Sequence, residues 1–585
     1  MWKPVGCCVL SSALLGTAAT SSALEPAVVI DAVIPSRSEV DVRDLPTPGD
    51  WQTGEPMLEG PPRRGTGLPV EDAVGSSASG WLTEPAAPAA RTSSTPGEHR
   101  RPSHTSRLSQ PELNFDAIEF TGVFPPDPVG EIGPEHYIQM VNGFSSSVVS
   151  IFNKDGEFLI RFLLEDLARG MPPVGDACEF GLGDPIVLYD ELDDRWVLTE
   201  FSGVANALCV YISDDDSPFG PYTLYEFPTE IFPDYPKYGV WTNSYLVSTN
   251  ELEAEDGGDP EEDEEAFPRP KVYALDKASM LRGEPAEIVR FTVPELAGFV
   301  FQAVTPADHD GELAPPPDSP GVFIRHRDDE VHDPGANDPE RDFLELFEVS
   351  VDFERDEFAL SEPQRIAVED YETFPCTVVG TFDCIEQPAT EQRLDVIGEV
   401  VMWRVQYRNN GGRETLVGNF SVDVGDEQAG IRWFELRQGS SGIWRLFQEG
   451  THAPDSDSRW LGSTAMDRAG NIALGYSVSS EVTFPSSRYA GRRARDPRGQ
   501  LPQGEFSIIE GSTAQTISDR WGDYSSLNLD PADGCTFWYT NEYLQPVELE
   551  DGEVTGAWQT RIATFRFERC QRHRSVEISA VIPDP

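Results

Sequence analysis

Short runs of alternating hydrophobic and polar residues fill the chain from Pro111 to Cys570. The runs are rich in aromatic and β-branched residues and are broken, about every eight to twelve positions, by Asp, Gly, Asn or Pro. Alternation with a period of two is typical of half-buried β-strands. The longest helical period covers about two turns, around Phe162–Ala168. The pattern therefore predicts an all-β domain.

One unit recurs through this region: a short strand, an Asp-Gly type turn and a longer strand that ends in a small polar residue. Its copies begin at Asp127, Asp190, Lys237, Ala307, Asp395, Asp467 and Asp530. The mean spacing of about 67 residues suits four-stranded blades with inserted loops. We therefore predict a seven-bladed β-propeller, with six or eight blades as the alternatives.

The last copy is followed by one clear strand, WQTRIATFRF, so the last blade lacks an outer strand. We expect Leu113–Thr121 to supply it, because a ring closed by strands from both ends has no open sheet edge. The alternative closing strand is Val576–Ile582.

The turns of the repeat contain aspartates, as at Asp190, Asp467 and Asp530. An aspartate in a turn hydrogen-bonds its own backbone. We interpret these aspartates as structural, and not as catalytic.

The N-terminal region has a different composition. Lys3 precedes an apolar run that ends on Ser21 and Ala23, which is typical of a secretory signal peptide. The following residues are rich in Pro, Ser, Gly and Ala, and they predict a disordered linker or pro-segment with a strand near Val28–Ile34. The expected segments are 1–23 signal peptide, 24–110 linker, 111–570 propeller and 571–585 tail.

The chain contains no further run that is long and apolar enough to span a bilayer, so we expect a secreted protein, extracellular or periplasmic. Six cysteines remain after the expected cleavage, and they allow up to three disulfides in 15 arrangements. Cys535 and Cys570 fall opposite each other in the expected last hairpin, so this pair is the best constrained. The other expected pairs are Cys178–Cys209 and Cys376–Cys384.

Acidic residues dominate the charge. The chain has 101 Asp and Glu against 44 Lys and Arg, of which only 5 are Lys, and the formal net charge is -57. Such a surface repels phosphate backbones and anionic headgroups, which excludes nucleic acid and membrane surfaces as expected partners. We expect a monomer adapted to high salt; calcium loading and genomic bias are the alternative explanations.

Two Arg-Trp pairs precede central strands of neighbouring expected blades: Arg459 with Trp460, and Arg520 with Trp521. Aromatic faces stack on sugar rings, and guanidinium groups hold carboxylate or sulfate with a fork of donors. The pairs therefore predict a site for an anionic glycan or another small anion. The alternative is tryptophan packed between blades, with arginine paired to local carboxylates.

Asp523 and Tyr524 follow the second pair. They are the candidate catalytic residues, an acid or base beside a nucleophilic or polarising phenol. Arg325 and Arg404 are further candidate ligand-binding residues, since they lie near the mouths of the expected fourth and fifth blades. Arg393 and Arg408 lie in the same region.

Two regions contain residue types that can bind metal ions. His309, His326 and His332 alternate with aspartates between Asp308 and Asp333, but their spacing fits no recognised metal motif, and solvated loops explain them more simply. The triplet Asp214–Asp216 offers oxygen ligands for calcium. The cofactor is therefore unknown, with structural calcium as one alternative.

Four strings resemble secreted bacterial β-propellers of a sialidase-like or Asp-box type, a largely uncharacterised family. They are PPDPVGEIGPEHYIQMVN, GDPIVLYDELDDRWVLTEF, RWLGSTAMDRAGNIALGYSVSS and RWGDYSSLNLDPADGCTFWYTNEY. The likeness spans about Asn114 to Cys570 and implies the fold. An Asp-box reads Ser-x-Asp-x-Gly-x-Thr-Trp, and Ser463–Asn471 departs from it, so the resemblance implies no catalytic residue.

Two functions follow from these patterns. The first is a secreted propeller that engages an extracellular anionic glycan, as a glycoside hydrolase or lyase. The second is a non-catalytic adhesion or scaffold module at the cell surface. A deep central pocket lined by Arg459, Arg520, Asp523 and Tyr524 favours the first, whereas a face plugged by Trp460 and Trp521 favours the second.

Overall fold

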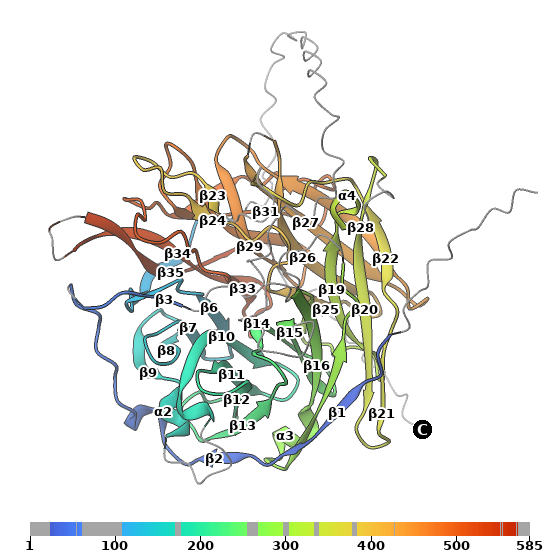
Figure 1. The fold of residues 1–585 in the computed structure, drawn as a ribbon. Coiled ribbons are helices and arrows are strands. Elements are labelled where there is room, and N and C mark those ends of the chain that lie inside the picture. Colours follow the sequence, from blue (N-terminus) through green and yellow to red (C-terminus); the bar gives the residue numbers. More distant parts are fainter. Residues whose placement is uncertain are drawn as a thin grey trace, which may run out of the picture.

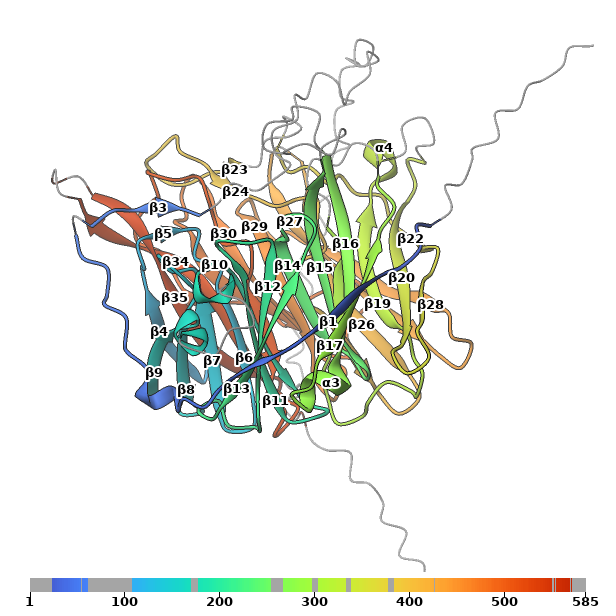
Figure 2. The ribbon, with the colours of Figure 1, turned by 60° about the horizontal axis from the view of Figure 1, so that its bottom comes forward.

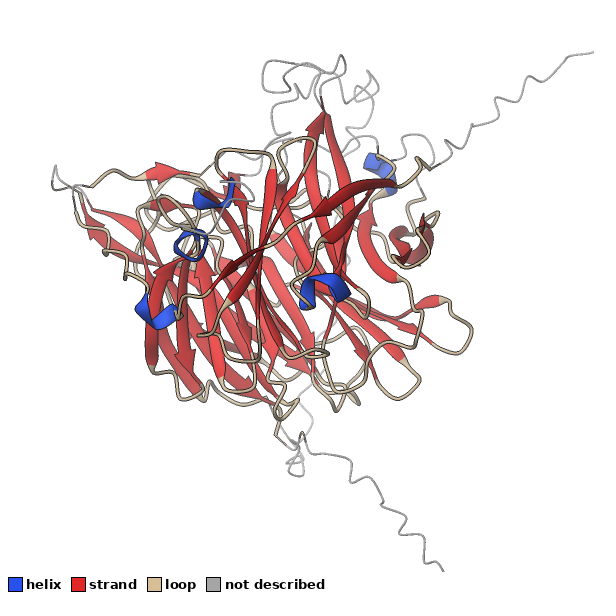
Figure 3. Ribbon diagram, turned by 90° about the horizontal axis from the view of Figure 1, so that it is seen from below, coloured by secondary structure: helices blue, strands red, loops and turns tan. Residues whose placement is uncertain are grey.

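The computed structural model describes residues 24–53, 55–60, 108–169, 177–253, 267–296, 303–332, 338–376, 383–425, 427–549, 552, 554–568 and 570. The expected signal peptide, most of the expected linker, and the alternative closing strand Val576–Ile582 lie outside these residues. Strands make up most of the described part (Figure 3). The all-β expectation is therefore confirmed.

Most strands belong to antiparallel meanders, in which four consecutive strands pair side by side. Each meander is named here by its first strand. The first three are β6 (Val129–Ile132), β7 (His136–Val141), β8 (Val148–Asn153) and β9 (Phe158–Leu163); β10 (Gly181–Asp190), β11 (Arg195–Ser202), β12 (Ala207–Ser213) and β13 (Tyr222–Pro228); and β14 (Asp234–Val240), β15 (Ser244–Glu253), β16 (Phe267–Asp276) and β17 (Ala286–Thr292).

Two further meanders are joined by a parallel pairing of their first strands, β18 with β25. In the first of them, β20 pairs with two short outer strands in succession. The strands are β18 (Thr305–His309), β19 (Gly321–Arg327), β20 (Asp342–Asp352), β21 (Glu357–Leu360) and β22 (Gln364–Val368), then β25 (Val405–Asn409), β26 (Glu414–Asp423), β27 (Ala429–Gln438) and β28 (Trp444–His452).

The C-terminal part of the domain forms the β29 meander and a sheet that combines both ends of the domain. The strands are β29 (Ser458–Met466), β30 (Ile472–Ser479), β31 (Ser486–Arg492) and β32 (Glu505–Ile509), then β33 (Ser526–Leu529), β34 (Thr536–Glu548), β35 (Val554–Arg566) and β4 (Leu113–Glu119). β4 is the outer strand of this sheet and runs antiparallel to β35.

The first strands of the meanders contact one another in cyclic order: β6, β10, β14, β18, β25, β29, β33 and again β6. The sheets are therefore arranged around a central axis, as a β-propeller (Figure 1). The central strands are buried on both faces, because each sheet packs between two neighbours. The hydrophobic clusters that fill these contacts include eight fully buried tryptophans.

The remaining elements are short. Two pairs of strands lie outside the meanders: β3 (Leu58–Glu59) with β5 (Val123–Phe124), and β23 (Asp383–Ile385) with β24 (Leu394–Asp395). The helices of the described residues are η1 (Val42–Asp44), α2 (Glu165–Ala168), η2 (Ala177–Glu179), α3 (Lys277–Leu281) and α4 (Asp329–His332). None of these helices has the length and apolar character needed to cross a bilayer.

The strand expected near Val28–Ile34 is present, whereas the expectation of a disordered linker is wrong for the described part of residues 24–60. β1 (Val28–Val33) pairs with the outer edge of β17, and β2 (Ser36–Ser38) pairs with the outer edge of β13. Figure 2 shows β1 running across the outside of the sheets. The unpaired edge of an outer strand is a template for another strand, and this segment occupies two such edges. We call residues 24–60 the N-terminal belt.

The turn aspartates have the structural role expected for them. The Asp467 carboxylate accepts backbone N–H groups from Ala469 and Asn471, both at 2.9 Å. Asp530 accepts that of Ala532 at 2.9 Å. Each carboxylate thus stabilises its own turn.

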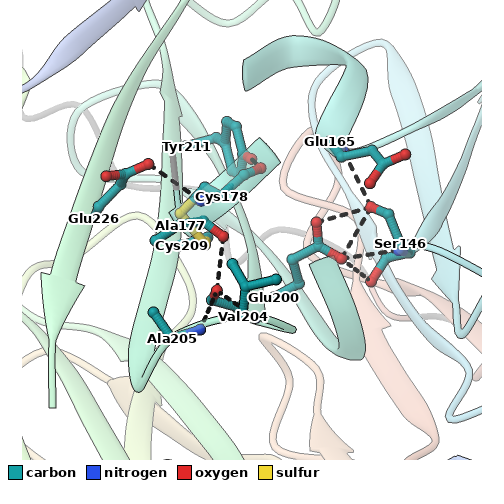
Figure 4. Close-up of a disulfide and its surroundings, with 12 residues drawn as sticks. Ser146, Glu165, Ala177, Cys178, Glu200, Val204, Ala205, Cys209, Tyr211 and Glu226 are labelled. Carbon is teal, nitrogen blue, oxygen red and sulfur yellow. Dashed lines mark hydrogen bonds between the residues drawn. A yellow bond between two sulfur atoms is a disulfide. The ribbon is translucent and has the colours of Figure 1, made fainter. Parts of the chain in front are cut away.

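The three expected disulfides are present. They are Cys178–Cys209, Cys376–Cys384 and Cys535–Cys570. The first joins η2 to β12, close to the buried carboxylate of Glu200 (Figure 4). The last joins the residue before β34 to Cys570, which follows the end of β35. The strand register pairs Thr536 with Arg566, so the two cysteines are close but not directly opposite each other, in contrast to the prediction.

Candidate functional site

The first Arg-Trp pair belongs to the interior of the domain. The Arg459 side chain is fully buried, and its Nε donates to Glu505 at 2.8 Å while its Nη1 donates to Asp455 at 2.8 Å. Trp460 is also fully buried. Both protein carboxylates already occupy the guanidinium fork, so Arg459 is held as a structural residue.

The two tryptophans pack against each other. The ring centroids of Trp460 and Trp521 lie 5.5 Å apart, and both side chains are fully buried. The Trp521 indole donates to Ser477 Oγ at 3.0 Å. The tryptophans therefore contribute to packing inside the domain, in agreement with the alternative prediction that they pack between blades.

Arg325 and Arg404 are paired with carboxylates in separate places. Arg325 donates to Glu345 through Nε at 2.9 Å and Nη2 at 2.7 Å. Arg404 donates to Asp308 at 2.8 Å and to Asp310 at 2.9 Å. The predicted arginines thus do not converge on one anion site.

Asp523 and Tyr524, in contrast, meet residues from two distant parts of the chain. The Asp523 backbone N–H donates to Asp127 Oδ1 at 2.7 Å, and the Tyr524 hydroxyl donates to Asp184 Oδ2 at 3.3 Å. Asn142 connects the other two aspartates: its amide donates to Asp127 Oδ2 at 2.7 Å and accepts the Asp184 backbone N–H at 2.9 Å. We call Asp127, Asp184 and Asp523 the aspartate cluster.

The chain enters the central strands at this cluster in an uncommon conformation. Asp127 and Asp184 have φ of 46°, and Tyr235 has φ of 52°. Each of the three precedes a proline: that after Asp127 lies just before β6, and those after Asp184 and Tyr235 lie within β10 and β14. Aspartate tolerates the left-handed region better than most residues, yet each such residue costs about 1–2 kcal/mol. Strained backbone of this kind concentrates at functional sites.

Burial changes the acidity of the cluster. The pKa of Asp127 is raised to about 7 by burial and by the neighbouring Asp523 carboxylate, against the opposing effect of Arg520. Burial, with Asp127 and Asp234 nearby, raises the pKa of Asp184 well above its ordinary range. Protons are therefore retained in this cluster near neutral pH.

Further buried groups surround the aspartates. Glu542 accepts the Gly522 backbone N–H at 2.6 Å, and burial raises the pKa of its carboxyl. The Tyr524 hydroxyl lies 3.1 Å from Pro236 O as well, so its one proton is shared between this carbonyl and Asp184, and burial raises the pKa of the hydroxyl. Lys237 lies 3.2 Å from the ring centroid of Tyr235. The cluster is thus held by several elements at once.

Access to the cluster is limited. Asp127, Asp523 and Tyr524 are buried, whereas Asp184 and Arg520 are half-buried. Arg520 Nη2 lies 3.8 Å from Asp523, and its Nε lies 3.8 Å from Asp395. Of these residues, Asp184 and Arg520 retain partial exposure to solvent.

Sequence reasoning missed Asp127 and Asp184. Asp127 stands in an Asp-Pro pair directly before β6, in PPDPVGE, and Asp184 stands in one within β10, in GDPIVLYD. The repetition of this pair at equivalent places of two expected blades was the available signal.

The histidine region contains a different carboxylate group. Among the described residues, oxygens of Asp328, Glu330 and Asp342 lie within 4.8 Å of one another, a spacing that could hold a cation. His326 stacks on Phe420, with ring centroids 4.9 Å apart. The expectation of structural calcium is not tested by this arrangement, because acidic groups gather without an ion as well.

Comparison with known proteins gives likeness in structure only. No protein-family model and no curated protein matches the sequence. The chain is similar to a phage phi92 endosialidase (10% identity, 82% of this chain and 72% of that chain, TM-score 0.33). It is also similar to a protein of unknown function from Dyadobacter fermentans (8%, 79% and 99%, 0.33) and to a polysaccharide lyase, a PL25 ulvan lyase (10%, 77% and 84%, 0.26). Function is therefore argued from the site itself.

Proposed function

We propose that this protein binds and cleaves an extracellular glycan at the aspartate cluster. The observation that carries the proposal is the meeting of three aspartates from three meanders, with Asp127 protonated near neutral pH. Cleavage of a glycosidic bond uses one protonated and one ionised carboxyl group. Asp127 is the proton donor in this proposal, Asp523 beside the Arg520 guanidinium is the second carboxyl group of the pair, and the half-buried Asp184 faces the sugar.

The charges of the aspartate cluster and Arg520 determine which kind of glycan fits the site. Asp184 and Asp523 are balanced locally by Arg520, and the other predicted arginines are paired elsewhere. Sugar hydroxyls suit such carboxylates as hydrogen-bond donors, whereas acidic groups need Arg520 as their partner. A glycan with hydroxyl groups at the cleavage point therefore fits the cluster better than a densely acidic one.

We infer that the cluster lies at one end of the axis of a seven-bladed ring closed by β4. The cyclic contacts of the central strands support this architecture, as does the antiparallel pairing of Ile562 with Phe115 and of Thr564 with Leu113. β21 and β22 share the outer position of one blade, and β18 and β25 join two blades. The axis of a propeller is a common place for a ligand site.

The proposal is tested with the mature protein and a panel of neutral and acidic polysaccharides. Release of reducing ends reports hydrolysis, and the ultraviolet absorbance of unsaturated products reports a lyase. Asp127→Asn should reduce the rate by about 100-fold or more, since a general acid contributes that much. Asp352→Asn, in a remote hairpin, is the matched control and should leave the rate unchanged.

The pH profile provides a second readout. Asp127 must hold its proton, so the rate should fall as the pH rises above about 7. Loss of all three aspartates without loss of product formation would refute the site. Absence of product with every polysaccharide would refute cleavage.

The adhesion or scaffold function remains the second candidate. Its supporting observation is the buried Trp460–Trp521 pair, together with the internal hydrogen bonds of the aspartate cluster. Glycan binding without any product, weakened by Asp184→Asn, would favour this second function over cleavage.

A further inference from the structure

A group of arginines gathers on the flank of the domain, around the hairpin of β27 and β28. Acidic residues outnumber basic ones by 101 to 44 in this chain, so a local excess of arginine runs against its overall charge. We call these residues the arginine cluster: Arg413, Arg437, Arg445, Arg492 and Arg498.

Phe447 is the centre of this cluster. The guanidinium carbon of Arg437 lies 3.2 Å from its ring centroid, and that of Arg498 lies 3.8 Å from it. Leu436 pairs with Leu446 and Glu435 pairs with Gln448, so Phe447 is the extra residue of a β-bulge. A β-bulge changes the direction in which a side chain points. Here the side chain at the bulge is Phe447, whose ring makes cation–π contacts with two guanidinium groups.

Like charges face one another in the cluster. Arg437 stands directly opposite Arg445 in the antiparallel register. Burial lowers the pKa of Arg437, and Arg413 and Arg498 lower it further. Burial also lowers the pKa of Arg492, with a contribution from Arg498 and Arg437. Opposed like charges destabilise a sheet, so the cluster costs stability when nothing binds it.

Few carboxylates offset these charges. Glu435, which is buried, accepts from Arg437 Nε at 2.6 Å. Asp496 is engaged by Arg493, from the backbone N–H at 2.8 Å and from Nη2 at 3.1 Å. Within the described residues, Nε and Nη1 of the buried Arg492 have no hydrogen-bond partner.

The outward part of the cluster is open to a ligand. Arg413, Arg445 and Arg498 are exposed, and they come from three loops or strands that are far apart in the sequence. We propose that the arginine cluster binds an anionic polysaccharide through its sulfate or carboxylate groups. Guanidinium forks match both groups in geometry and charge.

Two arguments favour a polysaccharide over a nucleic acid. Phe447 already carries two guanidinium groups, so its ring is not available for stacking on a base. The net charge of -57 repels a long, densely charged duplex, whereas a short anionic stretch of a glycan needs only the local cluster. This site uses none of the residues of the aspartate cluster, so the proposal does not rest on the proposed function.

The test uses the mature protein and heparin as the anionic probe. Arg445→Gln with Arg498→Gln should weaken heparin binding about tenfold and flatten its dependence on salt, because two ion contacts are lost. The control is Arg282→Gln with Arg355→Gln, two arginines outside the arginine cluster whose side chains are 55% and 72% exposed and which are held by neighbouring carboxylates. The control should bind heparin as the unmodified protein does.

A melting curve shows whether each variant is folded, and Arg445→Lys with Arg498→Lys separates charge from fork geometry. The lysine variant should bind with intermediate affinity. Equal binding by the unmodified protein and the glutamine variant would overturn the proposal, as would absence of heparin binding at low salt. Equally tight binding of duplex DNA, lost in the same variant, would overturn the choice of a polysaccharide.

Discussion

Glu200 and Glu505 are both largely buried glutamates, yet their environments shift their pKa values in opposite directions. Glu200 accepts hydrogen bonds from Ser146 and Ser147, but burial raises the pKa of its carboxyl to about 7 (Figure 4). Glu505 accepts from Arg459 at 2.8 Å and Tyr476 at 2.8 Å, and the pKa of its carboxyl is lowered. Of these two glutamates, Glu505 is the one at which hydrogen-bonding and ionic partners outweigh burial.

We expect Glu200 to make the stability of the protein depend on pH. Because its folded-state pKa is raised, its stabilising contribution is complete below about pH 4.5 and is lost as the pH rises through about 7. The loss at pH 8 is on the order of 3 kcal/mol. Melting curves at pH 5.5 and 8 should therefore differ less for Glu200→Gln than for the unmodified protein.

Glu505→Gln is the matched control for this measurement. Its folded-state pKa is lowered, so its stabilising contribution is already complete above the ordinary glutamate range. The variant should lose stability by the same amount at pH 5.5 and at pH 8. An unchanged pH dependence in Glu200→Gln would contradict the role assigned to its burial.

The N-terminal belt shows how a segment with a single predicted strand becomes part of the fold. Its pairs with β17 and β13 add a fifth strand to two sheets. Val42 of η1 is fully buried, and its backbone N–H donates to Phe219 O at 3.1 Å. The belt thus covers edges that would otherwise be open.

Truncation separates the belt from the closing strand. A chain that starts at residue 61 should be less stable than one that starts at Leu24, by about 2 kcal/mol or more, since several edge hydrogen bonds of about 1 kcal/mol each are lost. A chain that starts at Gly122 also lacks β4, and it should aggregate because β35 is left as an open edge. Melting curves and light scattering measure both effects. Equal stability of the chains starting at Leu24 and at 61 would show that the belt contributes nothing.

The net charge affects the stability of the whole folded protein. Carboxylates on one surface repel one another over about 10 Å at 0.1 M salt and over about 3 Å at 1 M. Surface ion pairs weaken under the same change, but 101 acidic against 44 basic residues leave repulsion as the larger effect. Screening should therefore stabilise the folded state.

We expect the melting temperature of the mature protein to rise between low salt and about 1 M sodium chloride, where screening is nearly complete. A chelator must be present, because calcium bound by carboxylate groups would produce the same rise. A constant or falling melting temperature would remove the support for salt adaptation.

Local patterns were enough to predict strands, turns and disulfides. Alternating residues predict strands, and an aspartate such as Asp467 forms its turn with the next few residues. Cys535 and Cys570 could be paired because they flank the two strands of one hairpin, although the last paired residues are Thr536 and Arg566 and the two cysteines are not directly opposite each other, in contrast to the prediction. These features depend on residues that are close in the sequence or in one sheet.

The candidate site and the arginine cluster could not be predicted in the same way. Asp127 and Asp523 are 396 residues apart, and only the ring of central strands brings the Asp523 N–H to the Asp127 carboxylate. Whether Arg459 is free or held by Glu505 depends on packing between strands of the same sheet and loops beyond it. Burial and the partners of a charged group arise from contacts across the fold, and for that reason the pKa of Asp127 and the pairing of each arginine followed from the tertiary structure alone.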